Sequence, residues 1–185
     1  MPAAGLSSRM GEWKLILPYQ NSTILEVSIK HALKACSRVI LVVGYRSDEL
    51  IDMMRSYPRV EVVVNENYQL GMLSSIQLGI EQVCSDYFFV AHADMPCINP
   101  TIFHQLWQSR AQGAVFPGSN VQSGHPVLIN AALKESILLS PSTGSMKSIL
   151  KNFPMSYLQL TDDGIHFDVD TPEAYQALQL ISKEK

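Results

Sequence analysis

The sequence predicts an α/β protein, a three-layer α/β/α sandwich around a mostly parallel, Rossmann-like sheet. Short apolar runs rich in β-branched residues alternate with stretches whose apolar residues recur at helical spacing. The runs are almost wholly apolar, which is typical of parallel strands covered by helices on both faces. The chain has 185 residues, of which 46% are hydrophobic and 17% charged. A chain of this size builds one large core, so we expect a single domain over residues 1–185.

The predicted elements follow one another in strand–helix order. The clearest strands are 39–43, 60–64 and 87–91, and shorter candidates are 113–116, 126–129, 155–160 and 165–169. Helices are expected behind the caps Thr23 and Ser47, over 73–83, and at Pro100 and Pro172 behind the caps Asn99 and Thr171. Ligands bind at the carboxyl ends of the strands in such sheets, so the loops after the strands are where chemistry is expected.

Charge and composition exclude several classes of protein. The net charge of −3, from 14 basic and 17 acidic residues, argues against nucleic acid as a partner. The apolar runs are too short to span a membrane, and no basic-then-apolar leader opens the sequence, so neither a membrane partner nor export is expected. Three cysteines without C-x-x-C spacing and five histidines without an H-E-x-x-H motif predict no disulfide framework and no zinc site. The expected location is the cytoplasm.

The first loop, residues 3–14, combines small residues with hydroxyl groups and cations. Its small residues allow backbone N–H groups to approach a phosphate closely, and they are Ala3, Ala4 and Gly5. Hydroxyl and cationic side chains follow at Ser7, Ser8, Arg9 and Lys14. The loop matches neither G-x-x-x-x-G-K-[ST] nor G-x-G-x-x-G. Taken alone, it is equally compatible with a surface turn that carries two solvated cations.

Two later loops supply carboxylates. Asp94 directly follows the apolar run 87–91, and Asp168 and Asp170 share one face of an extended segment before Pro172. Carboxylates at strand ends suit Mg²⁺, which prefers hard oxygen ligands and keeps phosphates as co-ligands. For each Asp alone, a turn or a helix cap is an equally good interpretation.

Two further loops carry polar groups after strands. Gly71 permits close backbone approach, and Ser74 and Ser75 open a helix whose free N–H groups suit a base edge or an anion. A serine-rich helix start is the simpler alternative. His125 follows Gly124, and it is either a ligand-facing or a structural histidine.

Together these loops describe a site for a nucleoside triphosphate with Mg²⁺. No serine or cysteine nucleophile paired with a histidine base is evident. An attacking phosphate needs no such base, because its second pKa is near 6 and it is largely ionised at pH 7. The protein then has to position the reactants and neutralise charge on the transferring phosphorus.

Six motifs in order resemble those of the molybdenum cofactor nucleotidyltransferases, the MobA-like NTP transferases. They are Ala3–Gly11 with Lys14, Gly44-Tyr45-Arg46, Gly71–Ser75, Asp94-Met95-Pro96, Gly124–Val127 and Asp168–Glu173. The resemblance covers essentially the whole chain. It is closer to the cytidylyltransferase branch, because the guanylyltransferase branch usually has Gly-Gly at Ala4-Gly5 and Asn-x-Asn at Asp168–Asp170.

The resemblance implies a role for each matching residue. Arg9 and Lys14 would bind the triphosphate of CTP, Asp94 would hold Mg²⁺ together with Asp170, and Asp168 is a further candidate ligand. The nucleotide would lie against a set of backbone and hydroxyl groups, namely those of Ala3, Ala4, Gly5, Ser8, Gly71 and Ser75. His125 would face the acceptor, a molybdopterin or molybdenum cofactor.

The implied reaction is Mg²⁺-dependent transfer of CMP from CTP to the molybdenum cofactor with release of pyrophosphate. The product would be the cytosine dinucleotide cofactor of molybdenum hydroxylases, and a hydroxylase apoenzyme is an expected partner. Two alternatives stay open: transfer to another phosphate or sugar-phosphate acceptor, and a non-catalytic carrier that delivers the cofactor.

The chain departs from the family pattern at two places. Family members normally begin with an apolar strand before the first loop, whereas only Met1 and Pro2 precede it here. Proline cannot donate to a central ladder, so we expect the first strand to be missing or damaged. His92-Ala93 also stands where a glycine directly before the Asp is usual.

Overall fold

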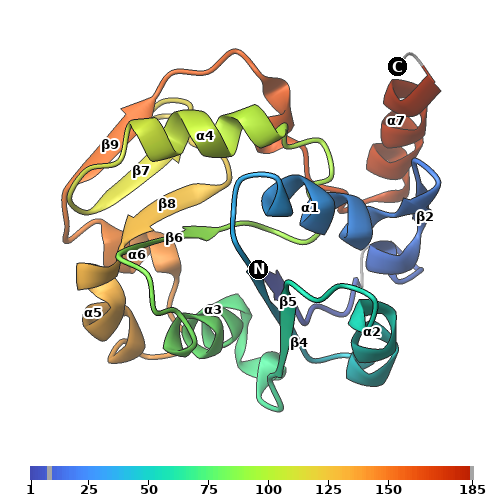
Figure 1. Ribbon diagram of the computed structural model, residues 1–185, viewed down its shortest axis with the longest axis horizontal. Coiled ribbons are helices and arrows are strands. Elements are labelled where there is room, and N and C mark those ends of the chain that lie inside the picture. The colour runs from blue at the N-terminus through green and yellow to red at the C-terminus, as the bar shows by residue number, and fades with distance from the viewer. Residues whose placement is uncertain (8–9, 184–185) are drawn as a thin grey trace.

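The computed structural model describes residues 1–7 and 10–183, and it has the α/β architecture that the sequence predicts (Figure 1). One sheet is wholly parallel in the order β1-β4-β5, and its strands are β1 (Pro2–Ala3), β4 (Val39–Val43) and β5 (Val60–Val64). The other has the order β6-β8-β7-β9, with β6 (Tyr87–Val90), β7 (Ala114–Pro117), β8 (Val127–Asn130) and β9 (Met155–Leu158). Helices pack on both faces, so the predicted fold class is confirmed.

The second sheet contains one strand that breaks the parallel pattern. Strand β8 pairs antiparallel with β6 and with β7, whereas β7 and β9 are parallel. An apolar run predicts a buried strand but not its direction, because direction depends on the path of the connecting chain. The run 126–129 therefore predicted the strand correctly and left its orientation open.

The helices alternate with these strands along the chain. They are α1 (Ile24–Leu33), α2 (Ser47–Met54), α3 (Met72–Glu81), α4 (Pro100–Gln108), α5 (Lys134–Leu138), α6 (Met146–Leu150) and α7 (Pro172–Lys183). Single 3-10 turns are η1 (Lys14–Ile16), η2 (Tyr68–Leu70), η3 (Ala131–Leu133) and η4 (Asp163–His166). The short α5 and α6 were not predicted, because five residues are too few to show a helical period.

Three of the four predicted capping residues directly precede a helix, and they are Thr23, Asn99 and Thr171. Thr23 and Glu26 form a reciprocal capping box at α1, and the Asn99 side chain accepts from the Thr101 N–H at α4. Ser47 was wrongly predicted as a cap, because it is already the first helical residue. Arg46 precedes it in the left-handed region with φ 52° and no side-chain cap hydrogen bond.

The predicted strand 165–169 is wrong. Asp162 accepts a hydrogen bond from the Gly164 N–H at 2.9 Å, which starts the turn η4 in place of an extended segment. A small hairpin was also missed, β2 (Pro18–Tyr19) with β3 (Ser22–Thr23). Its two turn residues, Gln20 and Asn21, both have positive φ, which is the geometry of a tight primed turn.

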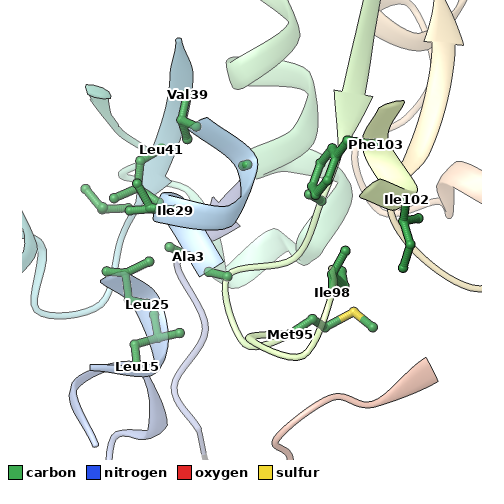
Figure 2. Close-up of a cluster of buried hydrophobic side chains, with 14 of the residues drawn as sticks. Ala3, Leu15, Leu25, Ile29, Val39, Leu41, Met95, Ile98, Ile102 and Phe103 are labelled. Carbon is green, nitrogen blue, oxygen red and sulfur yellow. The ribbon is translucent and has the colours of Figure 1, made fainter. Parts of the chain in front are cut away.

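The largest hydrophobic cluster lies under the loop that carries Asp94. Figure 2 shows Met95 and Ile98 from this loop beside Ile102 and Phe103 of α4. Ala93 and Met95 are both nearly inaccessible, at 2% and 3% exposed. Because the residues on either side of Asp94 are buried, the core fixes the position of its carboxylate.

Within the part of the chain that the structure describes, no helix combines the length and apolar character that crossing a membrane requires.

Candidate active site

Three loops that are far apart in sequence bring a lysine between two carboxylates. Lys14 begins η1 after the first loop, Asp94 follows β6, and Asp170 directly precedes Thr171 and α7. The Lys14 ammonium donates hydrogen bonds to Asp94 Oδ2 and to Asp170 Oδ1. The three side chains are only 13%, 16% and 24% exposed, so water screens their charges weakly.

The electrostatics of this cluster favour a cation between the carboxylates. Burial lowers the pKa of Lys14, but Asp94 and Asp170 outweigh burial, so its pKa lies above the ordinary value. Burial and the hydrogen-bonded carboxyl of Asp170 raise the pKa of Asp168. The two carboxylates of Asp94 and Asp170 together carry more negative charge than Lys14 alone neutralises.

A backbone hydrogen bond joins the two acidic loops. The Val169 N–H donates to the Asp94 carbonyl oxygen at 3.0 Å, and Val169 itself is fully buried. Thr171 Oγ1 accepts from the Ala174 N–H at 3.2 Å, so this threonine is the predicted cap of α7. With a threonine as cap, Asp170 turns its Oδ1 toward Lys14.

Two histidines stack beside the acidic loops. The rings of His92 and His125 lie 3.8 Å apart between centroids, with a tilt of 33°. Burial and the neighbouring His92 lower the pKa of His125 to about 3, and burial also lowers the pKa of His92. Both imidazoles are therefore neutral at pH 7, and the buried Nδ1 of His125 has no hydrogen-bond partner among the described residues.

Gly124 allows the chain to place His125 here. A Cβ at this position would lie 2.3 Å from the Ile165 carbonyl oxygen, which only glycine avoids. The same oxygen accepts a hydrogen bond from the His125 N–H at 2.9 Å. The stacking partner His92 was not predicted from the sequence, because ring contacts depend on long-range packing.

The first loop runs from β1 to Lys14 and folds back on itself. Ala3 and Ala4 are buried, whereas Gly5 is exposed and a Cβ there would meet no atom within 4 Å. Ser7 Oγ accepts from the Lys14 N–H at 3.3 Å. The role of Gly5 in ligand binding stays a prediction. The predicted site residues Ser8 and Arg9 lie outside the described residues.

A second basic group borders the first loop. The guanidinium of Arg46 lies 4.6 Å from the centre of the Trp13 ring, and it also pairs with Glu49. Gly44 lets Tyr68 pack closely against the chain here, because a Cβ at this glycine would lie 2.7 Å from the Tyr68 side chain. Arg46 belonged to a motif of the resemblance, yet the sequence alone suggested no role for it.

The predicted contacts Gly71 and Ser75 belong to a separate hydrogen-bond network. Asn65 Nδ2 donates to Ser74 Oγ and to Ser75 Oγ, both at 2.9 Å, and Ser75 is only 2% exposed. Gly71 is exposed, with φ 113°, and it is the N-cap of α3. This network holds the 65–75 loop against β1, which α3 contacts. Asn65 was missed, because a buried amide in a polar loop has no sequence signature.

The donor set fits a magnesium ion that also binds phosphate. Asp94 Oδ1 is buried without a hydrogen-bond partner in the described part of the chain. Residues 1–7 and 10–183 contain no group of three or more His, Cys, Asp or Glu side chains arranged to hold a metal. Mg²⁺ is commonly held by one or two carboxylates, with substrate phosphates and water as its other ligands, so Asp94 and Asp170 suffice.

The sequence is similar to two groups of enzymes that act on molybdenum cofactors. It is 36% identical to the molybdenum cofactor cytidylyltransferase of Escherichia coli K12, over 94% of this chain and 90% of that protein. It is 28% identical to a probable molybdenum cofactor guanylyltransferase of Bacillus cereus strain Q1, over 98% and 96% of the two chains.

The fold is also similar to that of known nucleotidyltransferases. A nucleotidyl transferase from Methanothermobacter superimposes with a TM-score of 0.86 at 20% identity, over 99% of this chain and 95% of that one. Residues 2–160 match the sequence profile of the MobA-like NTP transferase domain. Lys14, Asp94 and Asp170 thus lie in a nucleotidyltransferase, and the chain belongs to the MobA-like NTP transferase family.

Proposed function

We propose that this nucleotidyltransferase transfers CMP from CTP to the terminal phosphate of molybdopterin that carries molybdenum, with release of pyrophosphate. The observation that carries the proposal is the convergence of Lys14, Asp94 and Asp170 in one partly buried cluster. The choice of CTP and of the acceptor is supported by the 36% identity to a molybdenum cofactor cytidylyltransferase.

The reaction is a displacement at the α-phosphorus of CTP. An oxygen of the acceptor phosphate forms a bond to this phosphorus, and the bond to the bridging oxygen of the β-phosphate breaks, so that pyrophosphate leaves with the electron pair. The acceptor is already an anion at neutral pH and gives up no proton to the protein. Catalysis then consists of positioning and of charge stabilisation.

The residues of the cluster would divide this work. Asp94 and Asp170 would hold Mg²⁺, which when bound neutralises phosphate charge and orients the triphosphate. Lys14 would then turn its ammonium from the carboxylates to the phosphate oxygens, where negative charge develops. The neutral His92–His125 stack would offer a flat, uncharged wall to the acceptor.

Delivery of the product to a molybdenum hydroxylase apoenzyme is part of the same proposal. A dinucleotide cofactor that ends buried in a host enzyme needs a protected route. Direct contact between the two proteins would provide it.

The test is a panel of the four nucleoside triphosphates with Mg²⁺, with and without purified molybdenum cofactor. We expect pyrophosphate release that depends on the acceptor and is fastest with CTP. In a thermal-shift assay, CTP with Mg²⁺ should raise the Tm more than GTP does, because a ligand stabilises the state that it binds. A preference for GTP, or release with a sugar phosphate and none with the cofactor, would overturn the assignment.

A further inference from the structure

A groove of about 540 Å³ runs along α1. Gln20 and Ser22 line it before the start of the helix, and Lys34 and Arg59 line it at the other end. Figure 1 shows the start of α1 beside β2. Pockets of this size commonly hold small molecules in proteins, so the groove is large enough for a small organic ligand.

The far end of the groove lies at the opposite edge of the parallel sheet from the acidic cluster around Lys14. Lys34 lies between α1 and β4, and Arg59 directly precedes β5. Because β1, β4 and β5 are parallel, these two turns lie at the amino ends of the strands, whereas the first loop follows the carboxyl end of β1. No residue of the acidic cluster lines the groove among those that the structure describes. The proposed reaction therefore makes no use of it.

Three cationic side chains from two segments gather in the groove, namely Lys30, Lys34 and Arg59. Within residues 1–7 and 10–183, none of the three forms an ion pair with a carboxylate, whereas Arg38 and Arg55 each have one. No Asp or Glu of the same residues lines the groove. The whole chain has a net charge of −3, so this groove is a positive region on a negatively charged protein.

The carboxylate of Glu26, one turn before Lys30 on α1, is bound by hydroxyl groups. Tyr57 donates to Glu26 Oε1 at 2.7 Å, and Ser22 Oγ donates to Oε2 at 2.8 Å. The Lys30 ammonium donates to the same Ser22 Oγ at 2.9 Å. The Ser22 hydroxyl thus lies between the ammonium and the carboxylate, and it positions Lys30 without a direct ion pair.

Arg59 is the cation that the needs of the helix do not explain. Lysines in the last turn of a helix stabilise its negative end, and Lys30 and Lys34 have this effect at α1. Arg59 belongs to the turn before β5, and its Nη1 donates to the Cys36 carbonyl at 3.5 Å. This is a long hydrogen bond, and the other N–H groups of the guanidinium suit bidentate binding of a phosphate.

The groove also has surfaces for the organic part of a ligand. Val27 and Leu33 line it with apolar side chains, and the Tyr57 ring lies 6.0 Å from the Lys30 ammonium. An apolar wall with a few charged groups is the usual lining of a small-molecule site. A phosphate monoester carries nearly two negative charges at pH 7, so it matches several cations better than a single carboxylate does.

We propose that this groove is a binding site for a small phosphate monoester, separate from the active site. The phosphate lies at the end with Lys34 and Arg59, and the organic part extends along α1 toward Lys30 and Tyr57. The proposal is independent of nucleotide transfer, because it uses no residue of the acidic cluster.

The experiment titrates phenyl phosphate into the ¹⁵N-labelled protein and follows the amide resonances by NMR. EDTA is present, so that no divalent cation draws the phosphate to the carboxylates beside Lys14. We expect saturable shifts at the amides of Lys34, Tyr57 and Arg59. Benzoate, which has the same ring and one charge, should bind more weakly.

Two double variants show whether the cations bind the ligand. Lys34→Gln with Arg59→Gln should weaken phenyl phosphate binding by at least about tenfold, because the charge-assisted hydrogen bonds are lost. Lys147→Gln with Lys151→Gln also removes two exposed cations and should bind as the wild type does. All four side chains are exposed, so the Tm of both variants should stay near that of the wild type.

Three outcomes would overturn the proposal. The first is equal affinity of the two double variants for phenyl phosphate. The second is the same set of shifts with sodium chloride at equal ionic strength, which would show screening of surface charge and no site. The third is tighter binding of a hexaglutamate peptide than of phenyl phosphate at these amides, which would make the groove a surface for an acidic protein segment.

Discussion

The acidic cluster around Lys14 and the 65–75 loop are both polar regions at strand ends, but they differ in how fully their groups are paired. In the loop, Asn65 is buried and uses its amide for Ser74, Ser75 and the Asn67 N–H. In the cluster, Asp94 Oδ1 is buried and unpartnered among the described residues. A fully paired network stabilises the fold, whereas a buried carboxylate oxygen without a partner costs stability and is kept where a ligand uses it.

The largest expected effect is that of Asp94→Asn, which tests whether the acidic cluster around Lys14 serves a ligand. We expect transferase activity to fall by about 10³-fold or more, because the amide removes one of the two charged ligands of the cation and leaves only Asp170. The Tm should stay close to that of the wild type, since the amide still accepts from Lys14. Asp52→Asn, at an exposed ion pair with Arg55, serves as the control and should be fully active. Normal turnover by Asp94→Asn would remove this residue from the site.

Lys14→Ala should have the next largest effect. Loss of one cation that stabilises developing phosphate charge costs on the order of 10²-fold in kcat. The exposed Lys151→Ala is the matched control. If steady-state kinetics gave Lys14→Ala the same kcat as the control and the wild type, the first loop would not bind the triphosphate.

Asn65→Ala should lower the stability of the protein, whereas the two preceding variants should lower its activity. The free energy of unfolding should fall by about 2 kcal/mol, because two hydroxyl groups and a backbone N–H lose their partner. Urea unfolding measures this loss, and Asn120→Ala, at an exposed position, should cause little change. A loss of kcat at unchanged stability would show that the loop acts in catalysis and not in folding.

The last prediction is a pH dependence of stability from His125, which between pH 7 and pH 5 is similar in size to the effect of Asn65→Ala. Its folded pKa of about 3 lies below the ordinary 6.5, so the unfolded chain binds the proton more tightly. This contribution to stability is complete above pH 6.5 and is lost by about 1.4 kcal/mol per unit as the pH falls toward 3.

His125→Phe keeps a ring against His92 and removes this titration. Urea unfolding at pH 7 and pH 5 should therefore show a weaker pH dependence for the variant than for the wild type. His92 lies against this ring and is present in both chains, so the difference between the chains belongs to His125. Equal pH dependence would contradict the burial of a neutral imidazole.

The parts of the fold that the sequence predicts are those in which local pattern and burial agree. The runs 39–43 and 60–64 are strands, and Thr23 caps α1. In each case the local sequence pattern and the burial of its residues favour the same structure. The prediction of a strand over 165–169 was wrong, because the Asp162 side chain takes the Gly164 N–H and so favours a turn.

The site shows the same division. Loop positions after strands predicted Lys14 and Asp94, since strand ends gather at one edge of the sheet. Asp170 was expected after a strand that the structure does not have, and the hydrogen bond from Val169 to the Asp94 carbonyl brings its loop to the site. The roles assigned to these residues stay predictions. Asn65, the His92 ring and the Arg46–Trp13 contact depend on packing between distant segments, which no local pattern contains.

The hydrogen bond from Val169 to the Asp94 carbonyl ties the carboxyl-terminal segment after residue 160 to the site. The family profile ends at residue 160, yet Asp170 lies beyond it. Helix α7 is fastened to the Pro18 carbonyl through Tyr175 and Gln179, beside β2 (Figure 1). After a protease cut between residues 160 and 168, only the contacts of Val169 and α7 would hold the carboxyl-terminal fragment to the rest of the chain. Release of this fragment would remove Asp170 from Lys14, and we expect the remaining chain to be folded but inactive.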